Sequence, residues 1–283
     1  MTPVASSQNT TSTIARVSRH RTALTTARAL VAVLAAAPLA APLRAQGLPP
    51  QLHAPFDSLL RQHVRDGLVD YDAMARAPQF AAYLGTLARV RSDGWPRAER
   101  LAFLINAYNA YTIAQVNAHN ERRSIRNINK SFGVVGSGAW GEKMATIGGV
   151  TLTLDELEHE RIRPVFKEPR IHFALVCAAR GCPPLRAEAY RGDVLDQQLT
   201  DQARGFLLRS PTKNRVDVAA ATVYLSPIFK WYGSDFGKDE GARLRYIGSF
   251  FPDGAEAQLL ATGRARIRWT DYDWSLNILG KAQ

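Results

Sequence analysis

The hydrophobic pattern of the chain is strongest at residues 96–116, where apolar positions cover more than one face of a predicted helix. Eight positions carry large apolar side chains: Leu101, Phe103, Leu104, Ile105, Tyr108, Tyr111, Ile113 and Val116. A helix that is apolar on most sides lies in a protein core. Asn106 and Asn109 belong to the same helix, and a buried amide needs a hydrogen-bond partner. We therefore expect these two amides to hold neighbouring loops or, alternatively, to orient a substrate or a histidine.

Weaker patterns predict the remaining elements. Helical spacing with capping residues predicts helices at 58–66, 78–91, 153–163, 195–208, 228–232 and 255–262. Short apolar or alternating runs predict strands at 171–177 and within 216–225, an edge strand at 266–274, and a hairpin of 143–147 and 150–154. Since no internal repeat and no linker interrupts this order, we expect a single α+β domain. In it, a mainly antiparallel sheet packs against the buried helix and several shorter helices.

The glycine-rich segment before the hairpin contains a sequence that matches the consensus of a dinucleotide-binding motif. Gly136-Ser-Gly138-Ala-Trp-Gly141 matches Gly-x-Gly-x-x-Gly. That pattern binds phosphate only where a strand precedes it and a helix follows it, whereas a hairpin is predicted next. Nucleotide binding is therefore not expected.

The first 45 residues have the layout of a secretory leader. Four arginines (Arg16, Arg19, Arg21 and Arg28) precede an apolar run at 29–43, and Ala45-Gln46 follows. We expect residues 1–45 to be a signal peptide, with a retained N-terminal anchor as the alternative, and residues 46–283 to be a periplasmic or secreted domain. Beyond this segment no apolar stretch approaches the roughly 20 residues that a membrane span needs, so no further membrane contact is expected.

Charge narrows the class of partner. The chain carries a net charge of +11, and five arginines but no acidic residue fall within 1–45, so the remainder carries +6. The remaining arginines are scattered and do not alternate with aromatic residues, which is the pattern of a solvated surface rather than of a nucleic-acid site. We expect a small molecule or a peptide as the partner, and no nucleic acid.

Both cysteines lie close to a histidine in the stretch 170–184. If 171–177 is a strand, His172 and Cys177 lie on opposite faces and about 16 Å apart. Cys182 differs, because Gly181 allows a turn that returns it toward His172. A thiol at that position would ionise to the thiolate more readily than an ordinary cysteine.

Three states of the cysteine pair remain open from the sequence. An exported protein favours a disulfide between Cys177 and Cys182, because its compartment is oxidising and the loop between them is short. The alternatives are a free catalytic thiol at Cys182 and a redox-active pair, although the spacing is wider than in common redox motifs. Zinc is not expected, since His172 and two cysteines supply at most three ligands. We expect no cofactor.

Other candidate residues lie on two predicted helices. Glu158 shares the apolar face of helix 153–163 with Arg161, so it forms an ion pair with that residue or orients His172. His159 points to the opposite side and is the weaker candidate. Trp231 and Tyr232 wall a pocket or pack in the core.

Six motifs in order resemble one family, the domain of unknown function 547. They are Ile105-Asn-Ala-Tyr-Asn-Ala110, Leu157-Glu-His159, His172-Phe-Ala-Leu-Val-Cys177, Cys182-Pro-Pro-Leu185, Leu225-Ser-Pro-Ile-Phe-Lys-Trp-Tyr232 and Tyr272-Asp-Trp-Ser-Leu-Asn277. The resemblance spans roughly residues 60 to 277. It implies membership and no particular reaction.

A looser likeness concerns the order of elements. A buried helix, then a strand that opens with histidine, then an aromatic stretch resembles papain-like and transglutaminase-like cysteine enzymes. In those enzymes the helix carries the nucleophilic cysteine, whereas this chain has Asn106 there. The likeness therefore implies either a catalytically inactive relative that binds a ligand, or a nucleophile moved to Cys182.

The candidate functions follow from the state of the cysteines. A free thiol would make the protein a thiol hydrolase or acyl transferase, in which Cys182 is the nucleophile, His172 is the base, and Asn106 or Glu158 orients the imidazole. A structural disulfide would indicate a non-enzymatic binding or scaffold domain. An exposed, reducible disulfide would indicate a redox protein. In each case we expect the ligand near Asn109, Cys177, His159, Trp231 and Tyr232.

Overall fold

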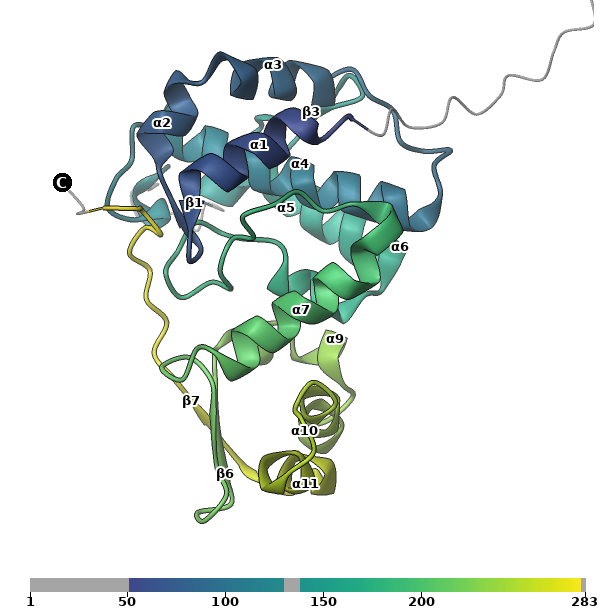
Figure 1. Cartoon of the computed structure of the whole chain (residues 1–283), viewed down its shortest axis with the longest axis vertical. Coiled ribbons are helices and arrows are strands. Elements are labelled where there is room, and N and C mark those ends of the chain that lie inside the picture. Colours follow the sequence, from purple (N-terminus) through teal and green to yellow (C-terminus); the bar gives the residue numbers. More distant parts are fainter. Residues whose placement is uncertain (1–50, 130–137, 281–283) are drawn as a thin grey trace, which may run out of the picture. The chain divides into compact units, whose positions relative to one another are not determined.

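A buried helix, α4 (Arg97–Ala118), is the longest element of the described chain (Figure 1). The computed structural model describes residues 51–129 and 138–280, so the leader expected at 1–45 lies outside the described residues. Every residue of α4 from Leu101 to Val116 except Ala114 is buried. The helix expected at 96–116 is therefore confirmed, and so is its burial on most sides.

Three short helices and a small hairpin precede α4. They are α1 (Ala54–His63), α2 (Tyr71–Arg76), α3 (Pro78–Leu87), and the antiparallel strands β1 (Val64–Arg65) and β2 (Leu68–Val69). Helices α2 and α3 contact α4, and α1 packs against α2 and α3. Phe56, Phe80 and Tyr83 join the same hydrophobic core as the buried residues of α4.

The hairpin that follows α4 has the two-residue turn that the sequence predicts. Strands β3 (Ala145–Ile147) and β4 (Val150–Leu152) pair antiparallel. Gly148 and Gly149 in the turn have φ angles of 57° and 85°, which glycine adopts readily and which this kind of turn requires. Two short 3-10 helices precede the hairpin in the described chain: η1 (Ile125–Asn127) and η2 (Gly138–Gly141).

The helix after the hairpin has three consecutive parts: α5 (Leu154–Glu156), the π-helix η3 (Leu157–Ile162) and α6 (Arg163–Phe166). Its expected capping box is present, because Oγ1 of Thr153 accepts the Glu156 N–H at 2.9 Å and Oε2 of Glu156 accepts the Thr153 N–H at 2.8 Å. The expected end before Pro164 is wrong. A new α-helical turn begins at Arg163, and proline is tolerated in the first turn of a helix.

The stretch 171–177 is not a strand. It begins in a 3-10 helix, η4 (Pro169–Phe173), and then continues as irregular backbone. The amide of Asn109 replaces strand pairing here, since it donates to the Ala174 carbonyl at 2.9 Å and accepts the Val176 N–H at 2.9 Å. A short buried apolar run predicts burial but not extended structure, which explains the error.

The C-terminal part alternates helices with a small sheet. In order, its elements are η5 (Gly192–Val194), α7 (Leu195–Leu208), β5 (Arg215–Asp217), β6 (Thr222–Leu225), α8 (Ile228–Trp231), α9 (Gly233–Phe236), α10 (Glu240–Gly248), α11 (Ala255–Thr262) and β7 (Arg266–Trp269). Strand β6 lies between β5, which is antiparallel to it, and β7, which is parallel to it. The α+β class is confirmed, and β7 is the expected edge strand. The strands of the described chain form three small sheets instead of one large sheet against α4.

Two hydrophobic cores meet at η4. Ile171 belongs to the core around α4, whereas Phe173 belongs to a second core built mainly from α7 to α11 and β6. Helix α10 packs against α11 beside β6 and β7 (Figure 1). His172 is therefore fixed between the two cores. None of the helices in the two described ranges is long and apolar enough to cross a membrane.

Candidate functional site

One cavity brings together most of the residues that the sequence singles out. It has a volume of about 190 Å³. Its lining includes six of the predicted site residues: Glu158, His172, Cys177, Cys182, Trp231 and Tyr232. We call it the aromatic cavity, because the other residues that line it include Tyr108, Trp140, Tyr272 and Trp274. The predicted residues Asn106, Asn109 and His159 do not line it.

His172 occupies the floor of the aromatic cavity between two carboxyl groups. It is only 4% exposed, and its Nε2 lies 2.7 Å from Oδ2 of Asp235. A carboxylate accepts hydrogen bonds, so Nε2 carries the proton and Nδ1 keeps a free lone pair. Nδ1 lies 3.9 Å from Oε1 of Glu158. Burial lowers the pKa of His172, and the hydrogen bond to Asp235 only partly opposes this effect.

The ring of Tyr232 holds the imidazole from one face. The two ring centres lie 4.0 Å apart, and the rings are inclined by 21°. Phe236 contacts the imidazole with ring centres 5.3 Å apart. These contacts and the Asp235 hydrogen bond fix the orientation of His172 without any contribution from Asn106.

Glu158 reaches the cavity from the π-helix η3. Its carboxyl is in the core, since the residue is 6% exposed. Burial raises the pKa of Glu158 to about 7, against the opposing effects of the Arg163 charge and the Tyr232 hydroxyl. The wider turn of a π-helix changes the direction in which its side chains project, and such turns are frequent at functional sites. Glu158 is thus a carboxyl group that is half protonated near neutral pH.

The expected ion pair between Glu158 and Arg161 is not formed. Arg161 is exposed and lines a different cavity, beside Leu104 and Ile147. The α-helical spacing used for that expectation does not apply along η3, because the π-helix is wound more widely. The other expectation, that Glu158 lies beside His172, is consistent with the 3.9 Å separation.

Asp235 is a residue of the candidate site that the sequence does not reveal. Its carboxylate receives two hydrogen bonds from Arg163, Nε to Oδ2 at 2.9 Å and an Nη to Oδ1 at 3.0 Å. The hydrogen bond from His172 and the Arg163 guanidinium hold the pKa of Asp235 well below its usual range. No periodicity connects Asp235 to a histidine 63 positions earlier in the chain. Only the fold brings them together.

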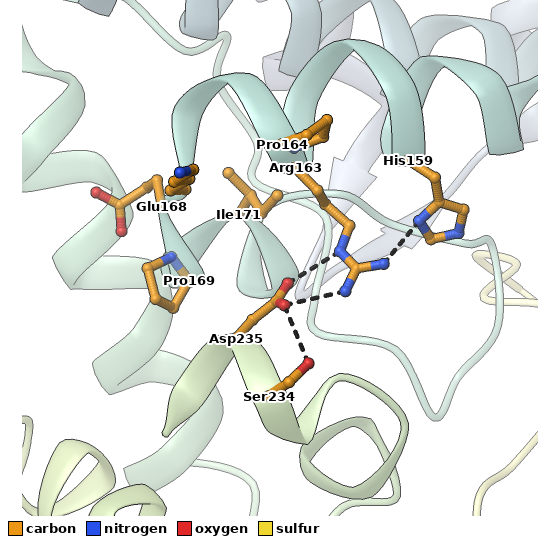
Figure 2. A pocket seen from close by; sticks show the side chains of 9 residues that line it. His159, Arg163, Pro164, Glu168, Pro169, Ile171, Ser234 and Asp235 are labelled. Atoms are coloured by element: carbon orange, nitrogen blue, oxygen red, sulfur yellow. Dashed lines mark hydrogen bonds and ion pairs between the residues drawn. The ribbon is translucent and has the colours of Figure 1, made fainter. Parts of the chain in front are cut away.

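Asp235 also lines a second cavity of about 450 Å³, which we call the outer cavity (Figure 2). His159, Arg163, Ser234 and Asp235 are among the residues that line it. Nδ1 of His159 accepts a hydrogen bond from Arg163 at 2.9 Å. Asp235 faces the outer cavity while its partner His172 faces the aromatic cavity. The weaker candidate His159 is therefore placed outside the aromatic cavity.

The cysteines form a disulfide in the wall of the aromatic cavity. Cys177 is bonded to Cys182, and neither cysteine is free. The disulfide that the sequence favours is therefore confirmed, and the alternative of a free thiol at Cys182 is wrong for this structure. The strand on which the predicted separation of about 16 Å between His172 and Cys177 depended is absent, and both residues line one cavity.

Hydrogen-bond donors surround the sulfur of Cys182. The backbone N–H of Cys177 donates to it at 3.0 Å, and the Tyr272 hydroxyl lies 3.1 Å from it. The same hydroxyl lies 3.2 Å from Sγ of Cys177. Among the residues that the structure describes, no group of three His, Cys, Asp or Glu side chains is arranged to hold a metal ion.

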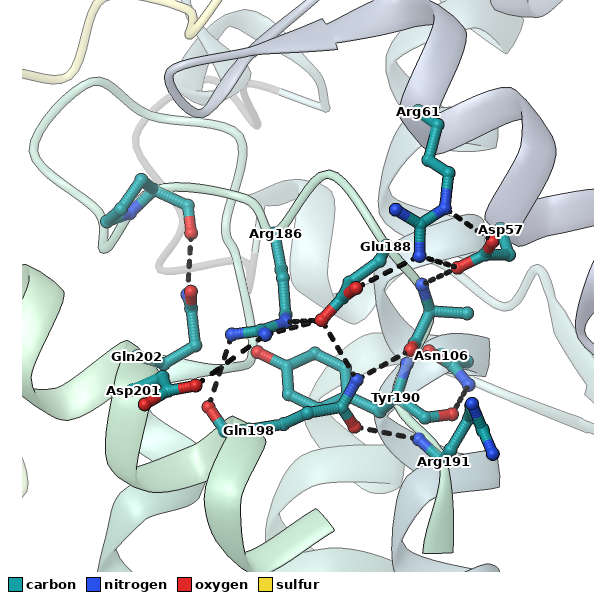
Figure 3. Close-up of polar contacts among 12 residues, drawn as sticks. Asp57, Arg61, Asn106, Arg186, Glu188, Tyr190, Arg191, Gln198, Asp201 and Gln202 are labelled. Atoms are coloured by element: carbon teal, nitrogen blue, oxygen red, sulfur yellow. Dashed lines mark hydrogen bonds and ion pairs between the residues drawn. The ribbon is translucent and has the colours of Figure 1, made fainter. Parts of the chain in front are cut away.

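Asn106 and Asn109 have the structural role that was one of the two expectations. Asn106 donates to the carbonyl of Tyr190 and accepts its N–H, both at 2.8 Å, within a polar network beside α7 (Figure 3). Asn109 holds the backbone of residues 174 and 176 in the same way. Asn106 therefore does not orient the imidazole, which corrects that part of the predicted site.

Four aromatic side chains form the rim of the aromatic cavity: Trp140, Trp231, Tyr272 and Trp274. Trp274 is the centre of the group, with ring centres 4.6 Å from Tyr272, 5.8 Å from Trp231 and 6.2 Å from Trp140. Trp231 is 49% exposed, so a large apolar surface stands open at the entrance. Trp231 was found by its sequence motif, whereas Trp140 lacked any signal.

Comparison with known proteins finds one family model that matches a segment of the chain. A family model described as "Protein of unknown function, DUF547" matches residues 92–207, which run from just before α4 to the end of α7. No curated protein and no solved structure matches the chain. The likeness to papain-like enzymes is therefore not confirmed. The matched segment contains Glu158, His172 and both cysteines, so it is this part of the chain that resembles the domain of unknown function 547 family.

Proposed function

We propose that this domain is a hydrolase that works by general acid–base catalysis, with His172 as the base, Glu158 as the acid and water as the nucleophile. The supporting observation is the position of the two groups, whose Nδ1 and Oε1 atoms lie 3.9 Å apart in the aromatic cavity. Titratable groups that burial has shifted and that share a cleft are typical of catalytic sites. The substrate is a small molecule, because the cavity measures about 190 Å³.

Each group has the protonation state that its role requires. The pKa of His172 is lowered, so its imidazole is neutral near pH 7 and Nδ1 accepts a proton from water. The pKa of Glu158 is raised to about 7, so a protonated carboxyl is available at the same pH to donate to the leaving group. Asp235 stays ionised and stabilises the imidazolium that forms.

The protons balance within the cavity. His172 takes one proton from water while the oxygen of that water bonds to the substrate. Glu158 gives one proton to the leaving group as the old bond breaks. Transfer of a proton from His172 to the neighbouring Glu158 then restores both groups for the next turnover.

Turnover of chromogenic esters by two variants tests this proposal. Glu158→Gln removes the acid and His172→Gln removes the base, and each should lower kcat by about 10²-fold or more while both proteins remain folded. A panel of 4-nitrophenyl esters supplies the probe. Hydrolysis at the wild-type rate by both variants would contradict the proposal. A panel that is bound but not cleaved would favour the alternative of a non-enzymatic binding domain.

Thiol–disulfide exchange is a second candidate, which the hydrogen bonds to Cys182 favour. After reduction, the Cys177 N–H and the Tyr272 hydroxyl would stabilise a thiolate at Cys182. The disulfide also lines the cavity that a thiol substrate would enter. Titration of the folded protein with glutathione redox buffers separates the two roles, because a structural disulfide resists the glutathione pool and a catalytic one does not.

Export is part of the same proposal. The leader pattern at 1–45 and the disulfide together favour an oxidising compartment, where a bond between Cys177 and Cys182 persists. Cell fractionation and the N-terminal sequence of the purified protein test it. A full-length chain with two free thiols in the cytoplasm would contradict export.

A further inference from the structure

We propose that the ligand of the aromatic cavity carries an alkylated ammonium group, which binds against the aromatic rim beside Asp155. This inference deepens the proposed hydrolase function, on which it rests for the reaction but not for binding. It names the chemical class of the substrate and the part of the cavity that recognises it.

The charges of the cavity favour a cation. Two carboxyl groups, Asp155 and Glu158, line it, and no lysine or arginine in the part of the chain that the structure describes does so. The chain as a whole has 36 lysine and arginine residues against 25 acidic ones, so this cavity is a local exception. An anionic ligand would find the Asp155 carboxylate and no basic side chain to bind it.

The aromatic rim supplies the second half of a cation site. The faces of tryptophan and tyrosine rings are electron-rich, and groups of them bind quaternary ammonium ions. Four such rings, Trp140, Trp231, Tyr272 and Trp274, contact one another at the entrance. The ring of Trp274 already makes one cation–π contact, because the guanidinium of Arg126 lies 5.2 Å from its ring centre.

Asp155 lacks a strong cationic partner. Its neighbour in the described chain is His159, whose Nε2 lies 3.9 Å from Oδ1. Burial and the Arg163 charge lower the pKa of His159, so this imidazole is neutral at pH 7 and leaves the carboxylate uncompensated. The Asp155 side chain is 42% exposed, so a ligand can reach it. A bound ammonium ion would supply the missing charge.

The lining residues differ in how deeply they are buried, and this difference predicts which end of the ligand lies at the entrance. Asp155 and Trp231 are partly exposed, whereas Glu158 and His172 are buried. An ammonium group at the rim therefore leaves the rest of the molecule pointing to the acid–base pair. The bond to be cleaved should lie a few atoms from the cationic group.

Binding of three isosteric probes to the purified protein tests the inference. The probes are choline, which is cationic; 3,3-dimethylbutan-1-ol, which is neutral with the same shape; and 3,3-dimethylbutanoate, which is anionic. Calorimetry or the fluorescence of the rim tryptophans measures the Kd of each. We expect choline to bind at least about 10-fold more tightly than the neutral probe, as cation–π and carboxylate contacts predict, and the anion to bind most weakly.

Two variants with matched controls locate the site. Trp231→Ala and Asp155→Asn should each weaken choline binding by about 3- to 30-fold and leave the neutral probe nearly unchanged. Trp269→Ala and Asp253→Asn remove the same groups from exposed positions that do not line the cavity, and they should leave all Kd values unchanged.

The outcomes separate this inference from the proposed function. Equal binding of choline and the neutral probe, tighter binding of the anion, no binding of any probe up to its solubility limit, or binding that survives both site variants would overturn the inference. If the inference fails while Glu158→Gln still stops ester hydrolysis, the hydrolase proposal stands. If choline binds as expected while Glu158→Gln and His172→Gln hydrolyse esters at the wild-type rate, the cation site stands and the hydrolase proposal falls.

Discussion

The acid–base character of the aromatic cavity depends on one imidazole whose two nitrogens face different carboxyl groups. Nε2 of His172 is hydrogen-bonded to Asp235, and Nδ1 faces Glu158. The two carboxyl groups have opposite shifts, because Asp235 is paired with Arg163 at a partly exposed position and Glu158 is buried. In the proposed mechanism, a carboxyl group would therefore serve as a permanent anion on one side of the ring and as a proton donor on the other.

Replacing Asp235 by Asn should impair catalysis more than folding. The variant removes the anion that orients His172, and we expect kcat to fall by about 10²-fold or more. Because Asp235 raises the pKa of His172, its loss should also move the acidic limb of the pH–rate profile to lower pH. Asp253→Asn, which makes the same change at an exposed position that lines neither cavity, is the control. An unchanged rate and profile would show that Asp235 does not act on His172.

Replacing Glu158 by Gln should stabilise the protein at alkaline pH. The carboxyl has a pKa of about 7 in the folded protein and about 4.3 when unfolded, so the folded state holds its proton more tightly. The stability it contributes is fully present below the unfolded value and is lost as pH rises through about 7.

Denaturant titrations from acidic to alkaline pH measure this effect. The unfolding free energy of Glu158→Gln relative to the wild type should rise by on the order of 3 kcal/mol across that window, as a shift of more than two pKa units implies. Glu160→Gln, which changes an exposed residue of the same helix, should show no such increase. A difference that does not vary with pH would contradict the raised pKa of Glu158.

Among the elements, the segment from η3 to the disulfide decides the geometry of the site. The sequence predicts α-helix followed by strand, and the protein has a π-helix followed by a 3-10 helix and irregular backbone. Neither error was avoidable from periodicity. The extra residue of a π-turn leaves little trace in the hydrophobic pattern, and the buried run 171–177 fits several backbone shapes. The sequence did reveal amide side chains in α4, which are unusual in a buried helix. One of them, Asn109, holds the irregular backbone after η4.

Asn109→Ala should therefore affect both stability and the pH profile. It leaves the Ala174 carbonyl and the Val176 N–H without their partner in the core, at a cost of about 2–4 kcal/mol. It also loosens the segment that follows His172. Asn106→Ala is a close control, because it removes two equally buried hydrogen bonds that hold Tyr190 instead. Identical effects of both variants on catalysis would contradict a positioning role for Asn109.

Replacing both cysteines by Ser should lower stability but leave hydrolysis. A disulfide that closes so short a loop contributes about 2 kcal/mol, mainly by restricting the unfolded chain. The proposed mechanism does not use the cysteines. Ester turnover at a temperature well below Tm should therefore change by less than about threefold, which corresponds to a change of under 1 kcal/mol in the activation free energy. Complete loss of turnover in a folded Cys177→Ser/Cys182→Ser variant would favour a reaction that uses the thiols. It would contradict the proposed acid–base mechanism.

At the level of the whole molecule, the site lies where two hydrophobic cores meet. The core around α4 supplies Glu158 and the disulfide, and the C-terminal core supplies Asp235 on α9 and its neighbour Phe236. The α+β class, the buried helix and the cavity around His172 and Trp231 were predictable, because hydrophobic periodicity and motifs report on burial. Asp235 and Trp140 were not, because their role depends on contacts between segments that are distant in the sequence.

The central claim is that His172 is a neutral base with its proton on Nε2 and its Nδ1 lone pair facing Glu158. Nitrogen NMR of the imidazole, recorded while pH is varied across the pKa of Glu158 at about 7, tests it without any knowledge of the substrate. We predict a neutral ring with protonated Nε2 at pH 7, and an Nδ1 chemical shift that changes as Glu158 loses its proton. A ring that is protonated on Nδ1, or that is an imidazolium at pH 7, would contradict it.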